Sequence, residues 1–450
     1  MGPGGEEVAG RLAEAGLDVV GIEHQLVGGE CPYWGCIPSK MAIRAANSLA
    51  EARRVADLAG SATVTPDWEP VARRIRDEAT DDWDDRVAVE RFVGKGGRFV
   101  RGRGRIAQPG VVAVGDELVE ARRGIVVATG ARPTIPPIPG LDDIPYWTNR
   151  EALEAVELPS SLVVLGGGAI GAELAQVFAR FGCRVTIVEA AARLLPLDEP
   201  EAGDVVTAVF AAEGIDVRVG VAAAAVRRDG LCYAVELADG SVVTGERILV
   251  ATGRRPDPAA VGLDVVGVPA DARSLPTDGR LRVAEGVWAV GDVAGHGAFT
   301  HVAVHQARIV AADILGGDPD PFEEHAIPRV TFTDPEVGAV GLTEQAARDV
   351  GADVAVGHAA VPSSARGWIH KAGNEGIVKV VADRARGILV GGTVAGPAGG
   401  EVLGLLALAV HARVPIPDLR RMIFAYPTFH RAVEDALRDL DDALRDLDDA

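Results

Sequence analysis

The chain has 450 residues, enough for two to four domains, and its 48% apolar and 24% charged residues are typical of globular proteins. Its formal charge of −20 argues against nucleic acid as a partner, because phosphates would be repelled. Four cysteines are too few for a secreted disulfide scaffold, and no apolar run reaches 18 residues without glycine or charge. We therefore expect a cytoplasmic protein without a membrane partner.

The first 23 residues match the second half of a dinucleotide-binding βαβ unit. Gly2 and Gly5 precede a helical pattern over 7–15, and an apolar strand over 18–22 ends in Glu23. In such a unit the glycines let the main chain approach a pyrophosphate, and the acid binds a ribose hydroxyl. The unit's first strand and first glycine are not in the sequence, so we expect a start site placed too late or a shortened chain. A disordered glycine-rich terminus is the alternative.

Residues 28–40 read GGECPYWGCIPSK and contain two cysteines five positions apart, Cys31 and Cys36, with Lys40 close behind. A long helix is predicted over 34–58. A helix N-terminus and a nearby cation both favour thiolate over thiol, which suits reversible disulfide exchange. For an isolated pair of this kind, a structural disulfide or two buried thiols would be the commoner interpretation. The remaining motifs favour the redox interpretation.

The next region is predicted to alternate between helices and short strands. Helices are expected over 67–79 and 82–93, and strands over 98–107, 111–114 and 124–128. The last strand ends in Ala-Thr-Gly at 128–130, and a proline-rich connector over 133–140 indicates a domain boundary.

A second dinucleotide site is complete. Its strand, glycine turn, helix, strand and acid follow in the required order at 161–165, 166–171, 172–181, 184–188 and Glu189. Gly166, Gly168 and Gly171 form the G-x-G-x-x-G turn, whose helix N-terminus attracts a pyrophosphate. Glu189 would bind a free 2′-hydroxyl and repel a 2′-phosphate, which favours NADH over NADPH, although Arg193 lies nearby. The alternative is a plain packing turn.

The rest of the chain repeats part of this pattern and then changes character. Strand-rich sequence over 218–250 closes with ATGRRP at 251–256, which echoes ATGARP at 128–133 and indicates an internal duplication. A strand then ends in Gly-Asp at 291–292, and a helix follows over 302–315. After residue 320 an α+β region is expected, with strands over 329–333, 354–360, 376–383 and 388–394 and helices over 401–410, 417–423 and from 428. An acidic seven-residue repeat over 435–448 predicts a solvated helical tail.

Together these motifs resemble the FAD-dependent pyridine nucleotide-disulfide oxidoreductases, a family that includes dihydrolipoamide dehydrogenase, glutathione reductase and mercuric reductase. The motifs that carry the resemblance are residues 28–40, 166–171, 251–256, 289–292 and 332–344. The resemblance implies an α/β fold with two Rossmann-like nucleotide-binding domains and a C-terminal α+β dimerisation domain. It implies an FAD domain in two parts, an NAD(P) domain and an interface domain, with boundaries at 1–148 and 276–320, 149–275, and 321–450.

The resemblance also implies a role for each matching residue. Cys36 would lie against the flavin as the charge-transfer thiolate, Cys31 would be the exposed interchange thiol, and Lys40 would approach flavin N5 with Glu173 as its partner. The residues expected to hold FAD are Gly2, Gly5, Glu23, Gly130 and Asp292. Those expected to hold NADH are Gly166, Gly168, Gly171, Glu189 and Gly253. No metal site is expected.

The chain departs from the family at the C-terminal acid–base motif, His-Pro-Thr-x-x-Glu. Tyr426 replaces the histidine and Arg431 replaces the glutamate. A tyrosine, with an ordinary pKa near 10, shuttles protons poorly at neutral pH, which puts efficient dihydrolipoamide or glutathione turnover in doubt. Mercuric reductase resembles this chain in having tyrosine there. His430 and Glu434, four residues apart, are a possible displaced pair, although an ordinary surface contact is commoner.

The redox loop differs as well, because Pro32, Tyr33 and Trp34 place bulk between the cysteines. We expect this bulk to narrow access or to offer a stacking surface to a flat acceptor. The sequence predicts a homodimeric enzyme that passes electrons from NADH through Cys31 and Cys36 to a small disulfide or thiol-reactive substrate. The alternatives are a quinone or small-oxidant reductase, a mercuric reductase-like enzyme, and a degenerate flavoprotein with a binding or sensor role.

Overall fold

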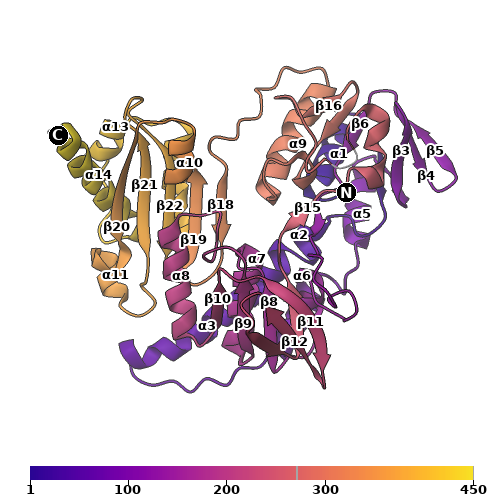
Figure 1. The fold of residues 1–450 in the computed structure, drawn as a ribbon. Coiled ribbons are helices and arrows are strands. Elements are labelled where there is room, and N and C mark those ends of the chain that lie inside the picture. The colour runs from indigo at the N-terminus through magenta and orange to yellow at the C-terminus, as the bar shows by residue number, and fades with distance from the viewer. Residues whose placement is uncertain (270–271, 449–450) are drawn as a thin grey trace. The chain divides into compact units, whose positions relative to one another are not determined.

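The structure is a computed structural model that describes residues 1–269 and 272–448, with side chains described as far as residue 440. The chain divides into two compact units (Figure 1). Unit 1 comprises residues 1–39, 72–134 and 253–323, and unit 2 comprises residues 40–71, 135–252 and 324–450. The predicted acidic tail over 435–448 is helical, as expected, but its first part is not solvated, because Ala436, Leu437 and Leu440 are buried in an apolar cluster.

Unit 1 contains one helical layer and several small sheets. Its helices and helical turns are α1 (Pro3–Glu14), α2 (Glu30–Tyr33), η1 (Ile75–Ala79), α5 (Arg86–Gly94), η2 (Ala259–Val261), η3 (Leu263–Val266), η4 (Asp292–Ala294) and α9 (Thr300–Ile314). Its strands are β1 (Val20–Glu23), β2 (Arg98–Arg101), β3 (Gly104–Gln108), β4 (Val111–Val114), β5 (Glu117–Glu120), β6 (Ile125–Val127), β7 (Arg132–Pro133), β15 (Arg254–Arg255), β16 (Arg282–Ala284) and β17 (Val287–Ala289). Helices α3 (Cys36–Leu58) and α4 (Glu69–Arg74) run across the division between the units.

The core of unit 1 lies between α1, α9 and the sheet β16-β17-β6. Val8 and Leu12 of α1 pack with Val310 of α9 and with Trp288 and Val290, at and just after β17. Strands β6 and β17 are parallel, as are β1 and β2, whereas β3-β4-β5 is an antiparallel meander. This packing directs the starts of α1 and α9 toward the loops that follow the strands, where nucleotides bind in α/β folds.

The nucleotide-binding part of unit 2 has a four-stranded parallel sheet in the order β10-β9-β8-β14. In chain order this is 3-2-1-4, the arrangement of a Rossmann half. All five residues of β8 are buried, as expected for the central strand of a parallel sheet. The elements of this part are α6 (Asn149–Glu154), β8 (Ser161–Leu165), α7 (Ala169–Phe181), β9 (Arg184–Glu189), α8 (Pro200–Ala212), β10 (Asp216–Val219), β11 (Ala223–Asp229), β12 (Cys232–Leu237), β13 (Val242–Gly245) and β14 (Arg247–Val250).

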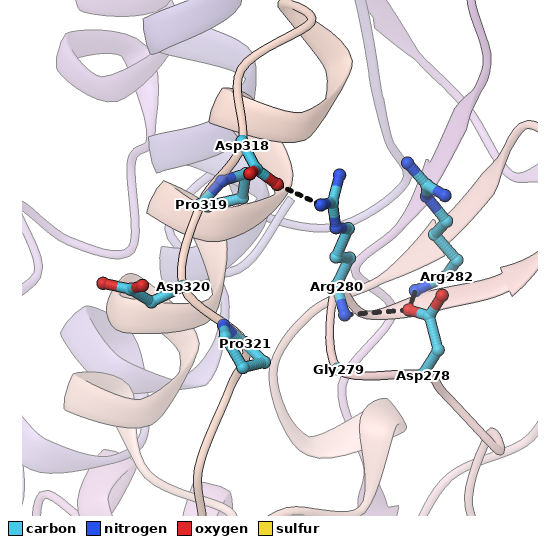
Figure 2. Close-up of a pocket in the computed structure, with 8 residues that line it drawn as sticks. All are labelled: Asp278, Gly279, Arg280, Arg282, Asp318, Pro319, Asp320 and Pro321. Atoms are coloured by element: carbon cyan, nitrogen blue, oxygen red, sulfur yellow. Dashed lines mark hydrogen bonds and ion pairs between the residues drawn. The ribbon is translucent and has the colours of Figure 1, made fainter.

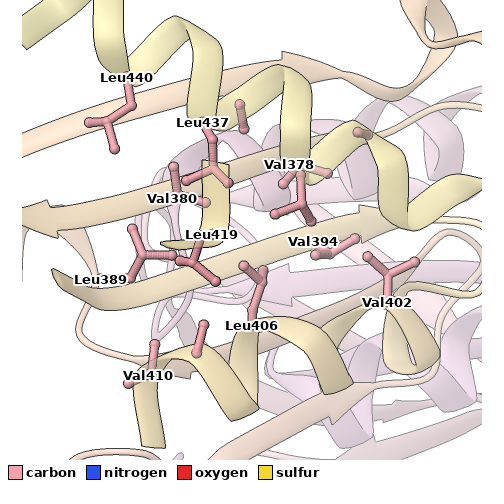
Figure 3. Close-up of a cluster of buried hydrophobic side chains, with 14 of the residues drawn as sticks. Val378, Val380, Leu389, Val394, Val402, Leu406, Val410, Leu419, Leu437 and Leu440 are labelled. Atoms are coloured by element: carbon pink, nitrogen blue, oxygen red, sulfur yellow. The ribbon is translucent and has the colours of Figure 1, made fainter. Parts of the chain in front are cut away.

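The C-terminal part of unit 2 is a five-stranded antiparallel sheet in the order β18-β19-β22-β21-β20. Val378 and Val380 of β21 face a large apolar cluster that includes Leu406 and Leu437 (Figure 3). The intervening Lys379 points to the other face, where it meets α8 and α10. The elements are β18 (Pro328–Thr331), β19 (Glu336–Gly341), α10 (Glu344–Asp349), β20 (Val354–Ala360), η5 (Val361–Ser363), α11 (Ala365–His370), β21 (Ile377–Asp383), β22 (Ile388–Gly396), α12 (Gly399–His411), α13 (Ile416–Arg421), η6 (Phe429–Arg431) and α14 (Ala432–Asp448).

The predicted α/β fold class is confirmed, but several predicted elements were wrong in detail. The helix expected over 34–58 begins at Cys36, because Gly35 turns the chain so tightly that an added Cβ would lie 3.0 Å from the Glu30 carbonyl oxygen. The strand expected over 98–107 is two strands, β2 and β3, that belong to different sheets. Helix α8 and strand β19 were not predicted, since short runs rich in alanine, valine and glycine show no clear period.

Candidate active site

The two cysteines occupy different positions relative to the helices of unit 1. Cys31 lies within the short helix α2, and Cys36 is the first residue of α3. Both are thiols in this structure. The Cys36 sulfur lies 3.5 Å from the hydroxyl oxygen of Thr300, which is the first residue of α9. Two helix N-termini and a hydroxyl group therefore favour negative charge on Cys36.

The two thiols do not share this environment equally. The contact with Cys36 raises the pKa of Cys31, burial adds to the rise, and the Thr300 hydroxyl opposes it. The sequence favours thiolate at this pair without naming the cysteine that carries it, and the resemblance assigns the thiolate to Cys36, an assignment with which a raised pKa of Cys31 is compatible. The physical reason is that a second negative charge beside the first is disfavoured.

The aromatic residues between the cysteines are packed inward. Tyr33 is 6% exposed and Trp34 is 9% exposed, with ring centroids 5.9 Å apart. The expectation that they offer a stacking surface to a flat acceptor was therefore wrong, because neither ring presents a face to solvent. They belong to the packing of the loop.

In unit 2 the structure brings Lys40 and Glu173 together. The Lys40 ammonium lies 2.8 Å from the Glu173 carboxylate and 4.6 Å from the centroid of the Phe332 ring. The other oxygen of Glu173, which is buried in α7, accepts the Phe332 main-chain N–H at 2.8 Å. This network fixes the direction of the Lys40 side chain.

The glycine turn at 166–171 has the tight geometry that its motif requires. An added Cβ on Gly171 would lie 2.0 Å from the Gly166 carbonyl oxygen, and Gly166 has φ +108°. Gly168 is the N-cap of α7, and an added Cβ there would meet nothing within 4 Å. A turn that is closed on its inner side and open at the helix N-terminus fits a pyrophosphate.

Glu189 and Arg193 follow this turn in the chain and hydrogen-bond to different parts of the main chain. The Glu189 carboxylate accepts the main-chain N–H groups of Gly167 at 2.6 Å and Ala191 at 2.7 Å. The Arg193 guanidinium donates to the main-chain carbonyls of Pro196 at 3.2 Å and Asp198 at 3.3 Å. The acid is therefore held at the turn, while the arginine is turned to the chain that follows.

Unit 1 contains the residues expected to hold FAD. Gly2 is the N-cap of α1, where an added Cβ would meet nothing within 4 Å, and an added Cβ on Gly5 would lie 2.7 Å from the Ala128 Cβ. Glu23 ends β1, accepts the Gln25 N–H at 2.7 Å and forms an ion pair with the N-terminal ammonium of Met1. Gly130 has φ +65° and open space around it. The positions at Gly2 and Gly130 leave room for a nucleotide, whereas both oxygens of Glu23 already have partners.

The Gly-Asp loop offers a direct test of whether the residues fit FAD. Gln306 of α9 is 0% exposed, and its Oε1 accepts the Gly291 N–H at 2.8 Å. Its Nε2 is buried and has no acceptor among the described residues. Burial raises the pKa of the adjacent Asp292, which the Arg254 guanidinium, 4.0 Å away, opposes. A buried donor without an acceptor fits a cofactor rich in phosphate and hydroxyl oxygens.

Two further predicted residues remain to be placed. Gly253 directly follows Ala251 and Thr252, whose main-chain atoms would lie 2.4 Å and 3.1 Å from a Cβ added to Gly166 of the glycine turn. Tyr426 is 70% exposed, and the Arg431 guanidinium lies 5.3 Å from the centroid of its ring. The possible pair of His430 and Glu434 was wrong, because Glu434 pairs with Arg431 at 3.1 Å and with Arg438 at 3.2 Å.

Sequence reasoning missed Thr300 and Gln306, and only a weak signal was available for either. Both lie on the helix after the Gly-Asp loop, and a threonine at the start of a helix is itself a start signal. No local pattern could show that Thr300 lies beside a cysteine 264 residues away.

The following observations concern features away from the predicted site residues. A hollow of about 460 Å³ in unit 1 is walled by Arg280, which pairs with Asp318, and by Asp278, which accepts the main-chain N–H groups of residues 280 and 282 (Figure 2). Among the described residues, no group of three or more histidine, cysteine or acidic side chains could hold a metal ion. Nor do the described helices include one long and apolar enough to cross a membrane.

The sequence matches two family descriptions. Residues 1–307 match the pyridine nucleotide-disulphide oxidoreductase family, and residues 327–437 match the dimerisation domain of the same family. The chain therefore belongs to the pyridine nucleotide-disulphide oxidoreductases and is an FAD-dependent enzyme of that family. The resemblance inferred from the motifs is confirmed, and the degenerate-flavoprotein alternative is not retained.

Individual relatives narrow the comparison further. A dihydrolipoyl dehydrogenase of Haloferax volcanii is 34% identical over 97% of this chain and 94% of its own length. A mercuric reductase of Shigella flexneri is 34% identical over 95% of this chain and 78% of its own length. The solved Cu(II) complex of RclA, an HOCl-induced flavoprotein disulfide reductase from Escherichia coli, has a TM-score of 0.85 at 26% identity, covering 97% of this chain and 98% of RclA.

Proposed function

We propose that this chain is a homodimeric, NADH-dependent reductase that delivers electrons through Cys31 and Cys36 to a small disulfide or thiol-reactive substrate. The observation that carries this proposal is the asymmetry of the pair: Cys36 lies at the start of α3 beside Thr300, while the pKa of Cys31 is raised by its contact with Cys36. FAD, when bound, accepts hydride from the nicotinamide and releases two electrons. The matched dimerisation domain supports the homodimer.

The residues of the chain would divide the remaining work. Cys36 holds the negative charge of the reduced pair, and Cys31, as the interchange thiol, attacks the substrate after losing its proton. Lys40 is held by Glu173, so its positive charge has a fixed place. The residues proposed to bind FAD are Gly2, Gly5, Glu23, Gly130 and Asp292. Those proposed to bind NADH are Gly166, Gly168, Gly171, Glu189 and Gly253.

The nucleotide preference follows from Glu189. Its carboxylate is anchored by two main-chain N–H groups at the glycine turn, where a 2′-phosphate would meet its negative charge. Arg193 donates to two main-chain carbonyls through one guanidinium nitrogen, so that nitrogen is already engaged. We therefore propose NADH over NADPH, measured as the ratio of kcat/KM for the two nucleotides.

The substrate class follows from Tyr426. We propose that it contributes a phenol beside the Arg431 guanidinium where other family members have a proton-shuttling histidine. This pair suits substrates that do not need a base near neutral pH, such as an electrophilic metal ion or a disulfide with an acidic leaving thiol. A mercuric reductase-like activity is the second candidate, supported by Tyr426 and by the 34% identity to the Shigella flexneri enzyme.

The test is anaerobic titration of the FAD-loaded enzyme with NADH, followed by a panel of acceptors. The panel contains lipoamide, glutathione and mycothiol-type disulfides, Hg(II) and quinones, and it compares wild type with Cys31→Ser. We expect NADH to expose new alkylatable thiols at residues 31 and 36 and the variant to lose turnover of disulfides and Hg(II). Retained turnover of quinones alone would favour the quinone alternative, and unchanged disulfide turnover would refute the proposal.

A further inference from the structure

A conformationally costly turn lies in unit 1 between η1 and α5. Asp81, Asp82 and Trp83 have φ values of 49°, 56° and 57°, a left-handed conformation that non-glycine residues rarely adopt even singly. In addition, the indole nitrogen of Trp83 is buried without an acceptor among the described residues. Strained backbone and unpaired buried donors persist where the surrounding structure over-determines them, often because they position a functional group.

The turn is held by Thr80, whose side chain is buried. Its hydroxyl lies 3.1 Å from the Ile75 carbonyl oxygen and 3.0 Å from the Arg76 carbonyl oxygen. The Asp82 N–H donates to the same Arg76 carbonyl at 2.7 Å. These bonds tie the left-handed residues to the first two residues of η1, so the chain that follows the turn has a fixed position.

The second residue after the turn is Asp85, which is 7% exposed and reaches the segment before the redox loop. Its carboxylate accepts the Val27 main-chain N–H at 2.7 Å. The same carboxylate accepts from the Arg101 guanidinium at 2.6 and 2.7 Å, and Arg101 also bonds the Gln25 carbonyl. Asp85 and Arg101 therefore clamp residues 25–27, which lead directly into Gly28, Gly29 and the helix of Cys31.

The residues after Cys31 pack against Gly28, which precedes Cys31. Burial, with the charge of Asp85 as the next cause, raises the pKa of Tyr33 to about 12. At Gly28, an added Cβ would lie 2.8 Å from Pro32 and 3.3 Å from the Tyr33 ring. The chain before Cys31 and the chain after it are thus closely packed at Gly28, directly after the residues that Asp85 and Arg101 hold.

We propose that Asp85 is a positioning residue for the redox pair: it fixes the segment that carries Cys31 and so keeps this thiol within bonding reach of Cys36. A disulfide forms only over a narrow range of Cα separations and orientations. A clamped segment stays in that range, whereas a loosened one must be ordered each time the bond forms. Asp85 contacts neither sulfur, and the inference rests on the proposed function only in that Cys31 and Cys36 form a disulfide.

The experiment measures the equilibrium between the dithiol and the disulfide in glutathione buffers. Enzyme dithiol and glutathione disulfide give enzyme disulfide and two glutathione thiols, so two electrons and two protons pass from the cysteines to glutathione. The FAD-loaded enzyme is acid-quenched and alkylated, and the peptide containing Cys31 and Cys36 is quantified by mass spectrometry. We expect Asp85→Ala to lower the equilibrium constant about tenfold, which corresponds to about 30 mV.

The matched control is Asp84→Ala, because Asp84 is the exposed neighbour and bonds the Arg86 N–H instead of the redox loop. We expect it to leave the equilibrium constant unchanged within about twofold, the precision of such titrations. Asp85→Asn keeps an acceptor for the Val27 N–H but loses the charge that Arg101 pairs with, so its effect should lie between those of wild type and Asp85→Ala.

An Asp85→Ala or Asp85→Asn enzyme that loses thermal stability but keeps the wild-type equilibrium constant would overturn the proposal, because Asp85 would then stabilise the fold alone. Should Asp85→Ala not fold, Asp85→Asn still decides the matter, since an unchanged constant in that variant refutes the positioning role. If wild type itself formed no bond between Cys31 and Cys36, the proposed function would fail instead, and the two failures are distinguished by that first measurement.

Discussion

The strongest stability prediction concerns Lys379, the charged residue at the centre of strand β21. Its side chain is 2% exposed, and its ammonium lies 3.0 Å from Glu199, 2.8 Å from Glu201 and 2.9 Å from Glu344. These carboxylates come from the N-cap and first turn of α8 and from the start of α10, so one cation joins the nucleotide-binding part of unit 2 to its C-terminal sheet. The perturbation is Lys379→Met, which keeps most of the aliphatic stem.

The expected loss follows from what the substitution leaves behind. Glu199 is as buried as Lys379 and would lose its cation, while Glu201 and Glu344 are partly exposed and can be hydrated. Breaking a buried ion pair from one side costs about 3–5 kcal/mol, because the remaining charge is uncompensated. At roughly 2 °C per kcal/mol for a unit of this size, we expect Tm to fall by about 6–10 °C.

The control and the pH dependence make the assay specific. Lys95→Met removes an exposed pair, in which the ammonium lies 3.4 Å from Glu14, and should cost at most about 1 kcal/mol. Burial alone would raise the pKa of Glu201, but hydrogen bonds, first that from Lys379, outweigh burial and lower this pKa. The pKa of Glu344 is also lowered, and the hydrogen bond from Lys379 is the main cause. A lowered carboxyl pKa stabilises the fold above the ordinary value near 4.3, and this contribution disappears as pH falls through the folded value.

The contribution of Lys379 to stability depends on pH in the opposite direction. Its pKa is raised: burial alone would lower it, but the three carboxylates outweigh burial. Its contribution is therefore present below the ordinary lysine pKa near 10.4 and is lost as pH rises through the folded value. Calorimetric unfolding of wild type and both variants between about pH 3 and 9 should show a constant difference for Lys379→Met above about pH 6 that shrinks below about pH 4. Equal losses for the two variants, or a difference independent of pH, would refute the reasoning.

Two further predictions address the chemistry. Thr300→Val keeps the shape of the side chain but removes the hydroxyl beside Cys36. A hydrogen bond to a charged group is worth roughly 1.5–3 kcal/mol. We therefore expect the thiolate fraction of Cys36 near neutral pH to fall about tenfold. Carbon-13 NMR of cysteine-labelled, reduced enzyme measures this, Thr300→Ser should behave as wild type, and an unchanged titration would show that the hydroxyl is irrelevant. Tyr426→His combined with Arg431→Glu should raise NADH-dependent lipoamide reduction about a hundredfold, the scale of acid–base catalysis, and turnover equal to wild type would show that another group limits this reaction.

The fold was predictable where local rules agree with one another. Strand β8, helix α7 and strand β9 form as expected because buried strand, glycine turn, helix and acid are all local signals. The split of β2 from β3 was not predictable, because it depends on which distant strands each one pairs with. The direction of Tyr33 and Trp34 was unpredictable for the same reason: a run of aromatic residues does not show which side of a loop they face.

The candidate site shows where such reasoning ends and what packing adds. In sequence, Cys31 and Cys36 are two equivalent thiols separated by a short loop, and only the family resemblance assigns them different roles. In the folded chain, Cys36 meets Thr300 across 264 residues of sequence, and the loop before Cys31 meets Asp85 across 58. The Thr300 hydroxyl contacts Cys36 and also opposes the raised pKa of Cys31, whereas the Asp85 contact concerns only the segment that carries Cys31. The difference between a charged thiol and a positioned attacking thiol is therefore a property of tertiary structure, because helix starts and clamps from elsewhere in unit 1 create it.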